Sequence, residues 1–153
     1  MKLFLGLILA LTSFGAIAQG SYDAAGVVKL QEKTFKPFVN SASATLTVGE
    51  AVCLDLTADD GIAIDYCITG FPAVGVIAQT ECAVGARCKV QTKGMFETVV
   101  LDVTQGNAVA GSAVYAHTDG SVYGDTTDTD KQSLGIFLDA ASASGTAQVF
   151  INP

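Results

Sequence analysis

Short apolar runs separated by turns dominate the chain from Thr45 onward. The runs are rich in Val, Ile, Thr and aromatic residues, and Gly, Asp or Ser interrupts them roughly every 8 to 12 residues. In the run 51–57, alternation places Val52, Leu54 and Leu56 on one face of a strand. The pattern predicts strands at 45–48, 51–57, 62–68, 73–79, 87–92, 95–103, 112–117, 121–124, 134–138 and 146–151.

These strands predict an all-β fold, because no stretch has a helical period long enough to compete with them. Many short antiparallel strands in one small domain are satisfied by a small barrel or a closed sandwich. The length of 153 residues allows a single domain with one sizeable core. We therefore expect a small antiparallel β-barrel or closed sandwich.

Glycines recur along the chain with a spacing of about sixty residues. Each match follows or precedes a similar apolar run, such as VGEAVC at 48–53 and AGSAVY at 110–115. The matched glycines are Gly49 with Gly111, Gly61 with Gly120, Gly75 with Gly135, and Gly85 with Gly145. This period exceeds that of the common solenoid repeats, so it indicates two halves of one domain. We expect half-repeats at about 47–94 and 108–153 within a β-domain at 47–153.

The first eighteen residues have the pattern of an export signal. Lys2 precedes an apolar run from Leu3 to Leu11, and Ala16-Ile17-Ala18 forms a small-x-small cleavage site. The run is short for a membrane span. We expect a signal peptide at 1–18 and no membrane association after processing; an uncleaved apolar anchor or a buried N-terminal helix are the alternatives.

Residues 19–46 differ from the rest and predict an extended N-terminal arm. Only 27–30 looks like a strand, Pro37 favours an extended Lys36, and a Ser/Ala-rich stretch follows. Phe35 and Phe38 on such an arm must pack, either on their own barrel or on a neighbouring subunit.

The charge balance narrows the possible partners. The formal net charge of −7 argues against nucleic acid, because phosphate binding needs a positive field. The charges are also unevenly placed. Positive residues gather at Lys29, Lys33 and Lys36 and at 87–93, whereas aspartates gather at 119–130. Such polarity suits docking between subunits.

Four cysteines fit an oxidising compartment. If the strands around Asp60 form a hairpin, Cys53 and Cys67 face each other; Cys82 and Cys88 straddle Gly85 in the same way. Both pairs are therefore candidate disulfides, although four cysteines allow three connectivities. Their spacing does not resemble a zinc site.

The sequence contains few residues that could form a catalytic or metal-binding site. The single histidine, His117, lies on a predicted strand, and no GxSxG, GxGxxG or GxxxxGK[ST] motif is present. The stretch DTTDTD, from Asp125 to Asp130, could ligate calcium, but it lacks the glycine and the terminal glutamate of an EF-hand loop. A solvated acidic loop is the simpler interpretation. We expect no enzyme activity and no cofactor.

Two segments resemble the small head-decoration, or capsid cement, proteins of tailed phages. These are AGSAVYAHTDGSV at 110–122 and LGIFLDAASASGTAQVFI at 134–151, and FPAVGVIAQTECAVGARCKVQTKGMFE at 71–97 is similar to the preceding half of that family. The resemblance covers about 47–153 and implies a β-domain, often trimeric, that sits on the outside of an assembled shell. It implies contacts with the major capsid protein or like subunits, and no catalysis.

Carried over by analogy, the arm is the shell-contacting element, and its candidate contacts are Phe35, Lys36, Phe38, Lys29 and Lys33. The export signal and the cysteines depart from this pattern, because capsids assemble in the cytoplasm. The sequence thus leaves two functions open. The first is a capsid cement protein at the virion surface; the second is a secreted, disulfide-stapled β-domain of a bacterial surface layer, filament or adhesion module.

Overall fold

The computed structural model describes residues 21–22, 28–29, 33–58, 61–68, 71–124 and 133–153. The predicted signal peptide at 1–18 and the acidic stretch 125–130 lie outside the described residues. The chain divides into two units, Met1–Gln31 and Glu32–Pro153. In the first unit, β1 (Ser21–Tyr22) pairs antiparallel with β2 (Val28–Lys29).

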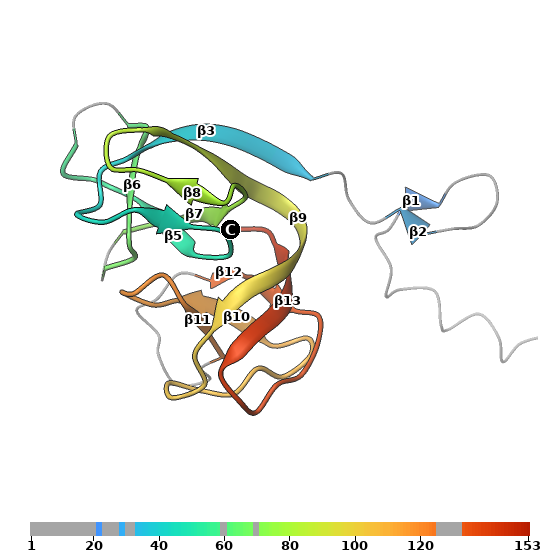
Figure 1. Cartoon of the computed structure of the whole chain (residues 1–153). Helices are drawn as coiled ribbons and strands as arrows, with labels where there is room; N and C mark the ends of the chain where they lie inside the picture. The colour runs from blue at the N-terminus through green and yellow to red at the C-terminus, as the bar shows by residue number, and fades with distance from the viewer. Residues whose placement is uncertain (1–20, 23–27, 30–32, 59–60, 69–70, 125–132) are drawn as a thin grey trace, which may run out of the picture. The chain divides into compact units, whose positions relative to one another are not determined.

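The second unit is built from strands, as predicted, and its described residues contain no helix (Figure 1). Each of the ten predicted segments contains a strand or part of one. The strands are β3 (Thr34–Asn40), β4 (Leu46–Thr47), β5 (Ala51–Leu54), β6 (Ala63–Asp65), β7 (Ala73–Ile77), β8 (Glu81–Cys82), β9 (Arg87–Leu101), β10 (Ala113–Ala116), β11 (Val122–Tyr123), β12 (Ser133–Phe137) and β13 (Gly145–Ile151).

The long strand β9 belongs to two closed circuits of five strands. Its first part pairs with β3 and β7, and the pairs β3–β6, β6–β5 and β5–β7 close that circuit. Its second part pairs with β13 and β11, and β11–β10, β10–β12 and β12–β13 close the other. Gly94, with φ +96°, separates the two parts. The prediction of a closed β-barrel is confirmed.

The two circuits repeat the same pairing pattern, which confirms the internal duplication. Val52 is opposite Gly75 and Val114 is opposite Gly135, and an irregularity in register follows each pair. The β6 strand runs parallel to β3, and β11 runs parallel to β9. The pairing makes Gly75 equivalent to Gly135, and the bonds of the Gly49 and Gly111 amides to Ile77 and Phe137 make these two glycines equivalent, so the spacing of both pairs reflects equivalent positions in the two barrels.

The predicted boundary of the arm was wrong for residues 34–46. The amide of Ser41 donates to the carbonyl oxygen of Ile64, and the amide of Asp102 donates to that of Val122. These equivalent bonds align β3 with the second part of β9, so the first repeat begins at β3 and the second begins after Gly94. Only Val39 and Asn40 of β3 pair with β6, and Pro37 is tolerated because most of β3 lacks a partner on that side.

Each barrel has its own buried cluster. The first is filled by Leu46, Val52, Ile64, Ile77 and Val90 with smaller residues. The second includes Val114, Val122, Leu134, Phe137 and Ile151, together with Ala51, Cys53, Cys67 and Val76 from the first repeat. The predicted face of 51–57 holds for Val52, which is buried, but not for Leu56, which is exposed because β5 ends at Leu54.

Two disulfides lie in the first repeat, one across the β5–β6 hairpin and the other across the loop between β8 and β9. Cys53 is joined to Cys67 and Cys82 to Cys88, the pairs that the spacing favoured. Cys53 lies opposite Asp65 in the β5–β6 pair, so the first disulfide fastens that hairpin near its end. All four sulfurs belong to buried residues.

Candidate partner-binding surface

The positive charges of the second unit gather on one ribbon of two strands. Among residues described between 33 and 153, every lysine and arginine lies on β3, on the first part of β9, or directly before β3. They are Lys33, Lys36, Arg87, Lys89 and Lys93. The described part of the second repeat carries four carboxylates and no lysine or arginine: Glu97, Asp102, Asp119 and Asp139. The charge polarity seen in the sequence is thus a polarity between the two barrels.

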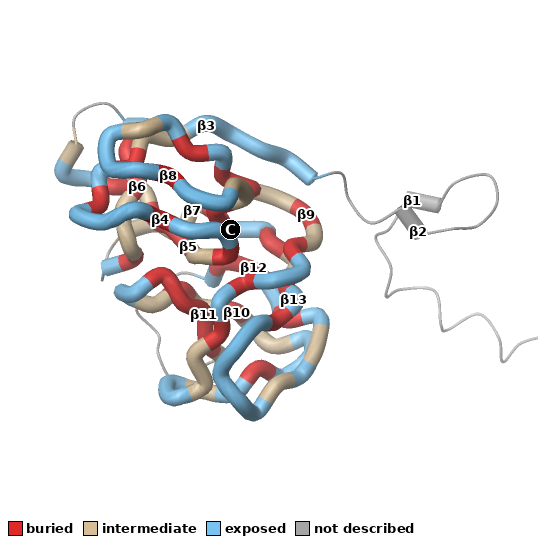
Figure 2. Tube along the Cα trace, in the orientation of Figure 1, coloured by how far each residue is buried: buried red, intermediate tan, exposed pale blue. Residues whose placement is uncertain are grey.

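The outer face of the β3–β9 ribbon combines an exposed aromatic ring with cations. Pairing sets Phe35 opposite Gln91, Pro37 opposite Lys89, and Val39 opposite Arg87, so these side chains share one face. Phe35 is 40% exposed, and the Lys89 Nζ atom lies 4.3 Å from its ring centroid. A shallow hollow of about 300 Å³ lies among them. Figure 2 shows β3 exposed along most of its length.

The opposite face of β3 looks into a groove at the first barrel. Lys36 and Phe38 line this groove of about 570 Å³, together with Leu54, Val74 and Lys93. The groove also reaches the last residues of the chain. It is open, and its walls are more apolar than polar.

The structure therefore divides the five predicted contact residues between separate places. Phe35 lies on the outer face of the ribbon and Phe38 lines the groove, whereas Lys36 borders both the groove and the hollow beside Phe35. Lys33 is exposed just before β3, and Lys29 belongs to β2 in the first unit. Sequence reasoning missed Arg87 and Lys89 as members of this surface; their spacing of two residues in a predicted strand was the available signal.

A buried polar network holds the ribbon rigid. The side-chain amide of Asn40 donates to the carbonyl oxygens of Cys82 and Ala44, and its oxygen accepts from the Ala42 amide. The neighbouring Cys82–Cys88 disulfide ties the start of β9 to β8. Farther along, the Lys89 amide donates to Gln79 Oε1 at 2.7 Å. Because these bonds fix the backbone under the exposed side chains, little order is lost when a partner binds.

Carboxylates of the second unit serve local turns. At Asp55 the Thr57 hydroxyl and then the Ser41 hydroxyl donate to the carboxylate and lower its pKa. At Asp102 the amide and then the hydroxyl of Thr104 do the same. Each carboxylate therefore stabilises the chain reversal after its strand, which is a structural role.

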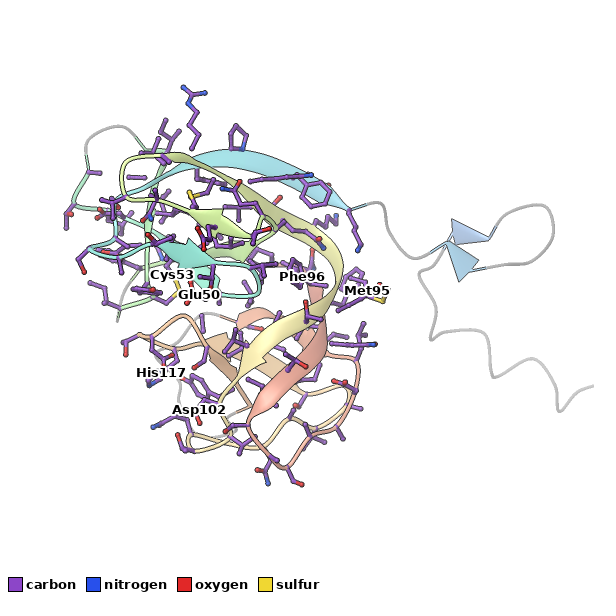
Figure 3. All side chains as sticks on the ribbon, viewed as in Figure 1. Glu50, Cys53, Met95, Phe96, Asp102 and His117 are labelled. Carbon is purple, nitrogen blue, oxygen red and sulfur yellow. A yellow bond between two sulfur atoms is a disulfide. The ribbon has the colours of Figure 1, made fainter. Side chains whose placement is uncertain are left out.

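His117 and Asp119 form a local pair in the second repeat. The His117 Nδ1 atom lies 3.0 Å from a carboxylate oxygen of Asp119. Burial opposes ionisation of Asp119, but donation by Ser121 and the contact with His117 together lower its pKa. Figure 3 shows His117 at the edge of the second barrel. Ser121 donates both its amide and its hydroxyl to Asp119, so these residues close a local turn.

The described residues contain no cluster of three or more His, Cys, Asp or Glu side chains that could hold a metal ion. The predicted calcium stretch, Asp125 to Asp130, lies outside them. The described residues include no helix that is long and apolar enough to cross a membrane. What the surface offers is contact area: an aromatic ring, cations and an apolar groove on a rigid frame.

Comparison with known proteins agrees with this description. The crystal structure of the head fiber gp8.5 N base of bacteriophage phi29 is similar to the chain, with a TM-score of 0.51 and 14% sequence identity. The match covers 78% of this chain and 95% of the phi29 chain, and at this identity it shows a shared fold. No curated protein matches the chain. The model of the phage cement protein family matches residues 38–152, from β3 to the end of the second repeat. The chain therefore belongs to the phage cement protein family and is a structural protein of a phage capsid.

Proposed function

We propose that the protein cements an assembled phage capsid by binding its outer surface and stabilising the seams between shell subunits. The observation that carries the proposal is the outer face of the β3–β9 ribbon, where exposed Phe35 lies among Arg87 and Lys89. Aromatic residues, phenylalanine among them, and arginine are enriched at the cores of protein interfaces. The major capsid protein is the partner, and several copies of the cement act together.

The charge of the face defines the shell surface that it fits. Arg87 and Lys89 are exposed and have no carboxylate bound to them among the ion pairs of the described residues. A complementary partner therefore presents carboxylates around a small apolar recess that receives the Phe35 ring. Each contact is modest, but symmetry repeats it over the shell, so the summed effect on rupture is large.

A binding experiment tests the proposed face. Purified shells lacking the protein are mixed with the wild type, with Phe35→Ala or with Lys89→Glu, and sedimented. We expect both variants to bind at least about tenfold more weakly, and added salt to weaken the wild type more than Lys89→Glu. The matched control is Val84→Ala, which truncates an exposed apolar residue in the turn before β9. Equal binding of Phe35→Ala and wild type would refute the proposed face.

A second measurement tests the cementing action. Shells with and without the bound protein are heated, and the temperature of rupture is recorded. The bound protein should raise this temperature, because contacts across a seam must break before subunits separate. An unchanged rupture temperature at full occupancy would show that the protein decorates the shell without cementing it.

The second candidate function is a secreted β-domain of a bacterial surface layer, filament or adhesion module. The two disulfides of the first repeat favour it, because such bonds form in oxidising compartments. Intact-mass measurement of native material separates the two functions. A full-length chain in purified virions supports the cement, whereas a chain starting near Gln19 in the medium supports secretion.

A further inference from the structure

The outer face of β5 and β7 in the first repeat is covered by the second repeat. Ala51, Cys53 and Val76 are buried there, in the same cluster as Val99 and Leu134 of the second barrel. Val76 is 0% exposed. The backbone takes part as well, since the Ala51 amide donates to the carbonyl oxygen of Gly120 at 2.7 Å. This face of the first repeat therefore packs on the barrel of the second.

Among the described residues, the equivalent face of the second repeat, on β10 and β12, is only partly covered. Val76 corresponds to Ile136, because each directly follows the glycine that faces the equivalent valine. Ala78 corresponds to Leu138, because their amides donate to Lys89 and Gln148, equivalent residues of β9 and β13. Ile136 is 42% exposed and Leu138 37%.

The inner faces of the same strands behave differently. Val52 and Val114 are equivalent and both are 0% exposed; Ile77 and Phe137 are equivalent and are 0% and 1% exposed. Equivalent inward residues are thus equally buried in the two repeats, whereas equivalent outward residues differ in their exposure. The face formed by Ala113, Tyr115, Ile136 and Leu138, which we call the β10–β12 face, has no barrel packed on it within the described residues, whereas its counterpart has one.

The groove of the first barrel corresponds to a place in the second barrel that is filled by the first repeat. Its residues Phe38, Leu54 and Val74 correspond to Val99, Ala116 and Leu134 of the second barrel. Those three are buried in the cluster that receives Ala51 and Val76. In the first barrel the equivalent residues are only half-buried and border the groove of about 570 Å³. Nothing within the described part of the chain fills it.

Charge favours contact between these two surfaces. Lys36 and Lys93 border the groove. Asp139 directly follows Leu138 of the β10–β12 face, and the described part of the second repeat holds carboxylates but no lysine or arginine. Two copies placed with one groove against the other β10–β12 face bring opposite charges together, whereas groove against groove does not.

We propose that the β10–β12 face of one copy of this chain docks into the groove of a second copy, head to tail. The contact repeats between chains the packing that joins the two repeats within one chain. A head-to-tail contact either closes into a ring or continues as a filament. The proposal does not depend on the capsid, because it concerns association of free chains in solution.

Sedimentation velocity of the purified full chain tests the proposal. We expect the wild type to self-associate, and Ile136→Asp and Lys36→Glu each to raise the dissociation constant at least about tenfold. Val109→Asp is the matched control, since Val109 is 57% exposed and lies outside both surfaces. If Ile136→Asp does not fold, as judged by circular dichroism, Leu138→Asp replaces it.

A mixing experiment distinguishes head-to-tail contact from other arrangements. Ile136→Asp keeps an intact groove and Lys36→Glu keeps an intact β10–β12 face, so an equal mixture should form one-to-one dimers that neither variant forms alone. A monomeric wild type, unchanged association of Ile136→Asp, or a mixture without dimers would overturn the proposal. Lys36 borders both the groove and the hollow beside Phe35, whereas Ile136 does not line that hollow, so shell binding by Ile136→Asp shows whether the two proposals fail separately.

Discussion

Replacing Gly135 with alanine tests the closest approach of two strands in the second barrel. A Cβ atom at this position would lie 1.9 Å from the carbonyl oxygen of Phe150 on β13. Real Cβ contacts essentially never fall below 3.0 Å, so the strands must separate by about 1 Å. The obstacle is backbone, and no change of side-chain rotamer relieves it. The rows of hydrogen bonds between β12 and β13 must therefore distort.

The expected cost follows from this overlap. Overpacking that shifts backbone costs about 1–3 kcal/mol, and an overlap with a paired strand belongs at the upper end of that range. For a domain of this size, about 3 kcal/mol lowers the melting temperature by roughly 12 °C. The equivalent Gly75→Ala change should act similarly, because its Cβ atom would lie 2.1 Å from the Gln91 carbonyl oxygen.

Gly145→Ala is the matched control. Gly145 has φ +156° and Gly135 has φ +157°, so alanine meets the same backbone preference at both positions. No heavy atom lies within 4 Å of a Cβ at Gly145. Thermal unfolding of both variants therefore isolates the clash. Equal losses would show that backbone conformation sets the cost, and that the tight approach of β12 to β13 is not required.

Two further predictions concern stability. Replacing both Cys53 and Cys67 with alanine should destabilise the protein by about 3 kcal/mol, and replacing both Cys82 and Cys88 by about 2 kcal/mol. The first loss is larger because the first disulfide spans 14 residues and the second spans 6. Urea unfolding measures both losses, and a larger loss for the second pair would contradict the dependence on loop length. Asp102 has a lowered pKa, so its contribution is present above about pH 4 and is lost as the pH falls further. As the pH falls through this range, the free energy of unfolding should decrease less steeply for Asp102→Asn than for the wild type. An unchanged slope would show that the hydrogen bonds from Thr104 to Asp102 do not stabilise the turn.

Glycine positions made the architecture predictable from the sequence. Gly75 and Gly135 must be glycine, because each faces a carbonyl oxygen of the next strand at a distance that excludes a Cβ atom. Gly49 and Gly111 have φ values of +90° and +83°, which other residues rarely adopt. Constraints of this kind act locally, so they remain visible after the rest of the sequence has diverged. Hence the repeat and the closed barrel were both correctly predicted.

The limits of the first repeat could not be predicted in the same way. The strand β3 contains Pro37, and its Phe35 and Lys36 break the usual alternation for a half-buried strand. It is a strand because β9 offers a complete partner on one side, which is information from distant sequence. The combination of Phe35 with Lys89 on the outer face of the β3–β9 ribbon was not predicted, for a related reason. Lys89 stands beside Phe35 only after β3 and β9 have paired, and 54 residues separate them in the chain.

The two repeats have kept their interiors and changed their exteriors, which locates function on the outside. Equivalent inward residues such as Val52 and Val114 are equally buried. The cysteines and the described cations of the second unit, in contrast, all belong to the first repeat. At the start of the second repeat, Figure 3 shows Met95 pointing away from the domain and Phe96 pointing toward its interior.

A duplication that retained two identical outer faces would bind the same partner at both ends. Here the strand registers place exposed Phe35 at the position of Met95 in the second repeat, and Lys36 at the position of Phe96, which is 8% exposed. A position that belongs to the core in one repeat thus carries an exposed cation in the other. Loss of symmetry gives the molecule direction, with a basic aromatic end and an acidic end. A directional building block can bind a shell with one surface and its own neighbours with others, which a symmetric one cannot do without competing with itself.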